Sequence, residues 1–130
     1  MTLHLTSGID VIEIDRIEQA LERWGGRFLN RIYTEREIAY CRGRAQSLAG
    51  RFAAKEATSK ALGVGIRRLR WRDIEILPDR MGKPHLHLHG GASDAAQRRQ
   101  LDRFEVSITH SRTDAIAIVN AWGDGQSSES

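Results

Sequence analysis

The stretch RFAAKEATSKALG, residues 51 to 63, combines a helical pattern with a high density of charge. With 100° between successive residues, one narrow stripe of a helix collects four alanines: Ala53, Ala54, Ala57 and Ala61. The opposite half collects five polar side chains: Arg51, Lys55, Glu56, Ser59 and Lys60. Alanines at four-residue spacing allow another backbone to approach closely. We therefore expect a helix that packs through its alanines and presents a polar groove on its other side.

Two apolar side chains, Phe52 and Leu62, fall inside the polar half, although a fully solvated helix face does not favour apolar side chains. This half is therefore expected to be partly covered. The alternative is an ordinary surface helix, in which Glu56 and Lys60 form one i,i+4 ion pair that contributes a few tenths of a kcal/mol. Spacing alone favours this alternative, because charged helix faces are usually solvated.

The whole chain has 130 residues, which suits a single domain with a modest core, here expected over residues 1–122. Because one small domain cannot readily enclose a large substrate, we expect a second subunit to complete such a site. The tail GDGQSSES, residues 123–130, is rich in Gly and Ser and is expected to be disordered. No run of 18 apolar residues and no signal-like N-terminus occurs, so we expect a soluble, cytoplasmic protein without a membrane partner.

Charge and cysteine content narrow the function classes. Twenty Lys and Arg against 17 Asp and Glu give a net charge of +3, which favours an anionic partner. Cys41 is the only cysteine, which excludes a disulfide framework and a cysteine-based zinc site, so we expect it to be a small buried apolar residue.

Local signals predict an α+β fold, with an antiparallel sheet packed on the long alanine-rich helix. In chain order, we first expect a buried strand over 8–14. A helix follows, capped by Asp15 and ended by Gly25-Gly26. A short helix then begins with a capping box at 34–37 and runs toward Cys41. Then follow the long helix over 45–62 closed by Gly63, a hairpin over 71–90, a helix with Ser93 as N-cap, and a hairpin over 103–122.

Three segments of the sequence resemble those of a known family: GIDVIEIDRI (8–17), RFAAKEATSKALG (51–63) and SITHS (107–111). Two shorter matching segments, DIEI (73–76) and GKP (82–84), lie between the second and the third. Over residues 7 to 121 the chain resembles the holo-acyl carrier protein synthases, the small bacterial branch of the 4′-phosphopantetheinyl transferases, and so is expected to share their fold. The resemblance implies transfer of 4′-phosphopantetheine from coenzyme A to a serine of apo-acyl carrier protein, in fatty acid or polyketide synthesis. It also implies a homotrimer with active sites at subunit boundaries.

The resemblance further implies a catalytic set of Asp10, Glu56 and Lys60, with a Mg²⁺ or Mn²⁺ ion on Asp10 and Glu56. Glu56, directly or through a bound water, would accept the serine proton, and Lys60 would stabilise or protonate the leaving phosphate. Asp10 is otherwise unexpected in an apolar strand, because burying an unpaired carboxylate costs several kcal/mol. A purely structural alternative is that Asp10 accepts hydrogen bonds from backbone amides at the strand end.

Contacts with coenzyme A are implied for seven further positions: Arg51, Lys55, Ser59, Gly63, Lys83, Pro84 and His110. Guanidinium, ammonium and hydroxyl groups suit phosphate oxygens, and Gly63 and Pro84 match positions that line the nucleotide pocket. Lys55 and Lys83 are equally well explained as solvated lysines.

A stripe of arginines follows Asp10, because Arg16, Arg23 and Arg27 fall within about 40° of one another on a helical wheel. It resembles the surface with which this family docks the acidic carrier. The alternative is a solvated face, which the neighbouring Glu18 and Glu22 would support, and Gly25-Gly26 leaves open whether one helix reaches Arg27.

Two other interpretations are less favoured. His85, His87 and His89 alternate along a strand at about 7 Å, which could suggest a metal site but fits an exposed strand face better. A non-catalytic basic module on the same fold, binding an acidic protein or nucleic acid, is the rival function. Nucleic acid is disfavoured because aromatic residues do not interleave with basic ones on a strand face.

Overall fold

The computed structural model describes residues 3–124, apart from the side chain of residue 67, so the expected disordered tail lies outside it except for Gly123 and Asp124. The chain forms an α+β fold, as predicted. Its elements are β1 (His4–Glu13), α1 (Ile14–Trp24), α2 (Gly26–Ile32), α3 (Glu35–Cys41), α4 (Ala45–Leu62), the 3-10 turns η1 (Ile66–Arg68) and η2 (Trp71–Asp73), β2 (Ile74–Pro78), β3 (Pro84–Leu88), α5 (Gly90–Arg98), β4 (Arg103–His110) and β5 (Asp114–Gly123).

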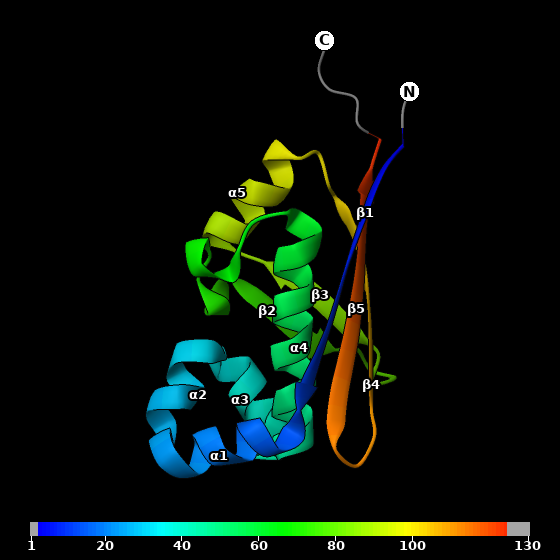
Figure 1. Ribbon diagram of the computed structural model, residues 1–130. Helices are drawn as coiled ribbons and strands as arrows, with labels where there is room; N and C mark the ends of the chain where they lie inside the picture. Colours follow the sequence, from blue (N-terminus) through cyan, green and yellow to red (C-terminus); the bar gives the residue numbers. More distant parts are fainter. Residues whose placement is uncertain (1–2, 125–130) are drawn as a thin grey trace.

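A three-stranded antiparallel sheet of order β1-β5-β4 packs on α4, while β2 and β3 pair separately (Figure 1). The alanine stripe of α4 makes this packing close. A Cβ atom on Gly8 of β1 would lie 2.0 Å from the Ala57 carbonyl oxygen, so only glycine fits there. All four stripe alanines are buried, which confirms the predicted close approach of a second backbone.

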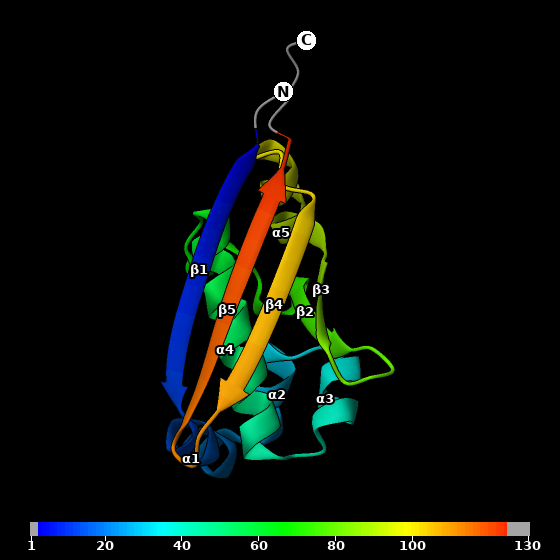
Figure 2. The ribbon, with the colours of Figure 1, turned by 90° about the vertical axis from the view of Figure 1, so that its right-hand side faces the viewer.

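The opposite face of the sheet is open to solvent, and parts of it on β1 and β5 are apolar. Figure 2 looks onto this face, with no helix in front of the three strands. Leu5, Ile9 and Val11 of β1 are each about 60% exposed, and Ile9 pairs with Ile118 of β5 in the register. The continuation of this apolar surface across two strands distinguishes it from isolated exposed hydrophobic residues.

Two predicted helix starts were wrong. α1 begins at Ile14 with Glu13 as N-cap, so Asp15 lies in the first turn, because β1 runs directly into the helix. α5 begins at Gly90 with His89 as N-cap, three residues before Ser93. At this helix start the Gly91 amide donates to the Asp73 carboxylate at 3.2 Å. The acceptor for this amide therefore comes from a segment distant in the sequence and not from an N-cap side chain.

Three other local predictions are confirmed. The Thr34 hydroxyl accepts from the Glu37 amide while the Glu37 carboxylate accepts from the Thr34 amide, which completes the capping box. Cys41 is a buried free thiol. Gly63 ends α4 with a left-handed φ of 71°. No helix within residues 3–124 combines the length and apolar character needed to cross a membrane.

Candidate active site

Asp10, Glu56 and Lys60 meet where β1 crosses α4. The Lys60 ammonium lies 3.1 Å from Oδ1 of Asp10 and donates to the Ile9 carbonyl at 2.8 Å. Glu56 lies one turn before Lys60 on α4. Lys60 therefore pairs with Asp10, and the alternative i,i+4 ion pair with Glu56 does not form within the described chain.

The electrostatics of Glu56 follow from this proximity. Partial burial raises the pKa of Glu56, the charge of Asp10 raises it further, and the charge of Lys60 acts in the opposite direction. The carboxylates of Asp10 and Glu56 repel each other, and the single Lys60 ammonium compensates only part of their charge. Such a site favours the binding of an added cation.

The donor set of Asp10 and Glu56 fits Mg²⁺. No group of three or more His, Cys, Asp or Glu side chains in residues 3–124 is arranged to hold a metal ion. Mg²⁺, however, commonly takes one or two carboxylates and completes its octahedron with waters and phosphate oxygens. A site of this kind would depend on a phosphorylated substrate.

Arg51, Pro84 and His110 line a second, separate site, a cavity of about 180 Å³. The Arg51 side chain is buried, and its guanidinium carbon lies 4.6 Å from the centre of the Tyr40 ring. Its Nε is a buried donor without a hydrogen-bond partner among the described residues. An unpaired buried donor of this kind costs free energy unless a ligand or a water completes it.

The two sites lie on different sides of α4. Arg51 and Lys60 are nine positions apart, which places them 180° apart on the helical wheel. None of the residues that line the Arg51 cavity belongs to the set Asp10, Glu56 and Lys60. The single chain therefore holds two half-sites that it does not join.

Lys55 lies in the interior instead of at a phosphate site. Its side chain is fully buried, and its ammonium lies 2.8 Å from Oε1 of Glu37. It also donates to the carbonyls of Trp71 and Ile74, so protein acceptors use all three of its N–H groups. Burial lowers the pKa of Lys55 and the charge of Glu37 acts against that shift. This arrangement leaves no donor for the phosphate contact expected from the sequence.

Three further predicted coenzyme A contacts lie apart from the Arg51 cavity. Ser59 is buried, and its hydroxyl donates to the Glu56 carbonyl at 2.8 Å. Gly63 forms the left-handed end of α4 below the Arg99 guanidinium, which a Cβ would meet at 3.0 Å. Lys83 lies on the β2–β3 turn and pairs with Glu105 at 3.2 Å. All three lie outside the cavity lining.

The predicted docking arginines are exposed, but they do not share one helix. Arg16 and Arg23 lie on α1, whereas Arg27 lies on α2, since Gly25 adopts a φ of 51° between them. Arg27 instead borders a cavity of about 510 Å³, together with Trp24. The first helix therefore ends at Gly25, as predicted, and Arg27 lies outside the helix that carries Arg16 and Arg23.

Sequence reasoning missed Glu37 and Tyr40. The motif TERE predicted only the cap, yet Glu37 is buried, pairs with Lys55 and also accepts from the Ile76 amide at 2.7 Å. Nothing in the pattern around Tyr40 indicated that it lies against Arg51. The histidine strand is exposed, as favoured, with His85 paired to Asp79 and His89 paired to Glu75.

Comparisons with known proteins agree with this architecture. Residues 7–119 match the model of the 4′-phosphopantetheinyl transferase superfamily. A holo-[acyl-carrier-protein] synthase of Herpetosiphon aurantiacus is 49% identical over 126 residues, which cover 92% of this chain and 99% of the relative. A holo-[acyl-carrier-protein] synthase of Halothermothrix orenii is 44% identical over 115 residues, covering 86% of this chain and 92% of the relative.

Solved structures give the same result. The holo-[acyl-carrier-protein] synthase of Helicobacter pylori, in complex with coenzyme A, superposes with a TM-score of 0.81 at 36% identity, covering 88% of this chain and 98% of that one. The acyl carrier protein synthase of Plasmodium yoelii with ADP bound gives a TM-score of 0.85 at 29% identity, with 95% and 98% covered. The chain therefore belongs to the 4′-phosphopantetheinyl transferase superfamily, within the family of holo-[acyl-carrier-protein] synthases.

Proposed function

We propose that this protein transfers 4′-phosphopantetheine from coenzyme A to a serine of apo-acyl carrier protein, in fatty acid or polyketide biosynthesis. The observation that carries the proposal is the convergence of Asp10, Glu56 and Lys60 at the crossing of β1 and α4. Relatives named holo-[acyl-carrier-protein] synthase, and a related structure in complex with coenzyme A, support it.

In the proposed reaction, the serine oxygen attacks the phosphorus atom that carries the pantetheine group. The serine O–H proton passes to the Glu56 carboxylate, directly or through a water. The bond from that phosphorus to the bridging oxygen breaks, and adenosine 3′,5′-bisphosphate leaves. Lys60 donates to the leaving phosphate, where negative charge develops. Asp10 and Glu56 would hold a divalent ion, Mg²⁺ or Mn²⁺, which supplies neutralisation of the pyrophosphate charge.

We assign the other phosphate contacts of coenzyme A to the Arg51 cavity. Its rim combines Arg51 and His110 with the rigid Pro84, and the unpartnered Nε of Arg51 supports an anionic ligand there. Lys83 lies next to this rim in the sequence and can supply a further positive charge.

A homotrimer would join the two half-sites, since the site of Asp10 and the site of Arg51 lie on opposite sides of α4 in one chain. The apolar outer face of the sheet supports association with further copies. Light scattering is expected to give three times 14.7 kDa. Leu5→Glu with Ile118→Glu should abolish both the trimer and transfer, and a fully active monomer would contradict the proposal.

The docking of the carrier is assigned to Arg16, Arg23 and Arg27, because acyl carrier proteins are acidic in this family and these side chains are exposed. A reducing compartment such as the cytoplasm suits the free thiol of Cys41.

The direct test is to incubate the protein with coenzyme A, Mg²⁺ and an apo-carrier, and to weigh the carrier by mass spectrometry. We expect a gain of one phosphopantetheine group that requires the carrier's serine. Stable binding of the carrier without any gain in mass would favour the alternative, a non-catalytic basic module.

A further inference from the structure

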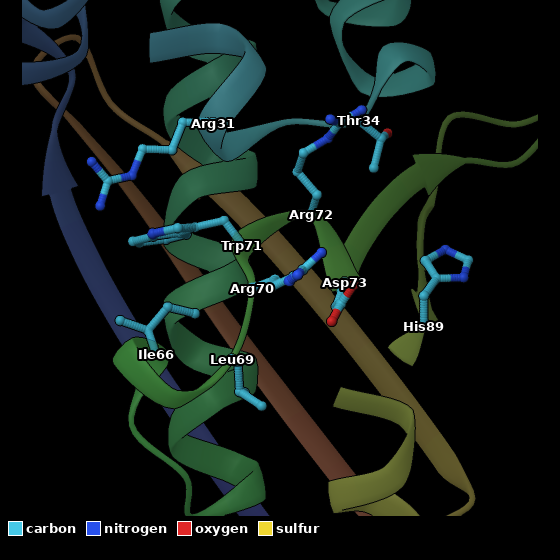
Figure 3. Close-up of a pocket in the computed structure, with 9 residues that line it drawn as sticks. All are labelled: Arg31, Thr34, Ile66, Leu69, Arg70, Trp71, Arg72, Asp73 and His89. Carbon is cyan, nitrogen blue, oxygen red and sulfur yellow. The ribbon is translucent and has the colours of Figure 1, made fainter. Parts of the chain in front are cut away.

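A cavity of about 850 Å³ is lined by residues of α2, of the η1–η2 segment and of the start of α5, and it shares no lining residue with either half-site. Figure 3 shows its lining, with Trp71 between Arg31 and Ile66 and with the Arg72 side chain extending toward Thr34. Among its described lining residues, three side chains are permanently cationic: Arg31, Arg70 and Arg72. Three are apolar: Ile66, Leu69 and Trp71. A partner that fits this lining combines negative charge with apolar groups.

The positive charge of the cavity is not neutralised within the described chain. Neither an ion pair nor a side-chain hydrogen bond within residues 3–124 engages Arg31, Arg70 or Arg72. Asp73, the one acid among the described lining residues, accepts a hydrogen bond from the Gly91 amide at 3.2 Å. The cavity therefore keeps three arginines available to an anionic partner.

The cavity is continuous with the surface assigned to carrier docking. Arg31 and Trp71 line both this cavity and the neighbouring one of about 510 Å³, which Arg27 and Trp24 also line. The wall between the two cavities is held in place, since Trp71 stacks on Phe52 with ring centres 4.8 Å apart. The Trp71 carbonyl also accepts from the buried Lys55 at 3.1 Å.

We propose that this cavity binds a second acidic segment of the carrier protein, so that the docking surface extends from α1 over α2 to Arg70 and Arg72 on the η1–η2 segment. This inference rests on the proposed function. Its basis is the continuity through Arg31 and Trp71 together with the uncompensated charge. A protein surface supplies both the carboxylates for the arginines and the apolar side chains for Ile66, Leu69 and Trp71, whereas a small inorganic anion supplies only charge.

The test reverses two charges in the cavity and compares them with a matched pair elsewhere. Arg70→Glu with Arg72→Glu is the cavity variant. Arg80→Glu with Arg98→Glu is the control, since both residues are exposed and lie outside the lining of either cavity. Calorimetric binding of apo-carrier should weaken about tenfold in the cavity variant and less than about twofold in the control, because charges at an interface rim steer association. The KM for coenzyme A and the melting temperature should match those of the control.

Equal carrier affinity in the two variants would overturn the inference. So would a cavity variant that loses binding of inorganic pyrophosphate, or of anionic lipid vesicles, while keeping its affinity for the carrier. The proposed function fails separately, if the unmodified protein binds the carrier but adds no mass to it. No carrier binding by the unmodified protein would overturn both.

Discussion

The Lys60 ammonium lies 3.1 Å from Oδ1 of Asp10, although the two residues are 50 positions apart in the chain. Gly8 allows this contact, because it brings the backbone of β1 against Ala57 of α4 two residues before Asp10. The Ile9 carbonyl holds the same ammonium at 2.8 Å. The catalytic set is thus positioned by backbone packing as well as by its own charges.

Removal of either carboxylate is expected to stop transfer without unfolding the chain. Asp10→Ala and Glu56→Ala should each lose nearly all activity, since a divalent ion would keep one protein ligand instead of two. Carrier mass and melting temperature are the measurements, and Asp94→Ala on α5 is the control. Full activity of either variant, or of the unmodified protein in excess chelator, would contradict the two-carboxylate site.

Breaking the buried pair of Lys55 and Glu37 should cost stability. Lys55→Met leaves the Glu37 carboxylate buried without its cation, and we expect the free energy of unfolding to fall by about 3–5 kcal/mol. Urea unfolding measures this change, with Lys83→Met as the exposed lysine control. A variant that keeps its stability but loses affinity for coenzyme A would show that Lys55 contacts a phosphate after all.

Cys41 should be unreactive in the native protein. Burial raises the pKa of its thiol to about 11, and the thiolate, which is the reactive form, is therefore scarce at pH 8. Iodoacetamide at pH 8 should leave the native chain unmodified over a period in which urea-unfolded chain is fully alkylated. Because the fold favours the protonated thiol, its contribution to stability is complete below the ordinary thiol pKa and is lost as the pH rises from that value through the raised pKa. Equal alkylation rates would show that Cys41 is accessible.

Charge reversal on α1 should weaken the encounter with the carrier while leaving coenzyme A bound. Arg16→Glu with Arg23→Glu is expected to raise the KM for the carrier about tenfold, with a much smaller change in kcat. Raising the ionic strength from about 0.05 to 0.3 M shortens the Debye length, so kcat/KM should fall more steeply for the unmodified protein than for the variant. The same KM and the same salt slope in both would remove α1 from the docking surface.

Local patterns in the sequence were sufficient for much of this structure. Gly63 marked the C-terminal end of α4, the alanine stripe marked its packed face, and the spacing between Thr34 and Glu37 predicted the capping box. These features depend on residues within a few positions of one another, so periodicity and capping chemistry determine them. Asp10, Glu56 and Lys60 were recognised through the family resemblance, and the fold brings them together.

Only the tertiary structure decided how each polar residue is used. The helical wheel placed Lys55 and Lys60 on the same half of α4, yet Lys55 is buried against Glu37 and Lys60 is half exposed beside Asp10. Likewise the start of α5 depends on Asp73, 18 positions from Gly91. A periodic pattern shows which side chains share a face, but burial and hydrogen-bond partners come from segments distant in sequence, so packing determines whether a charge meets solvent, a ligand or the core.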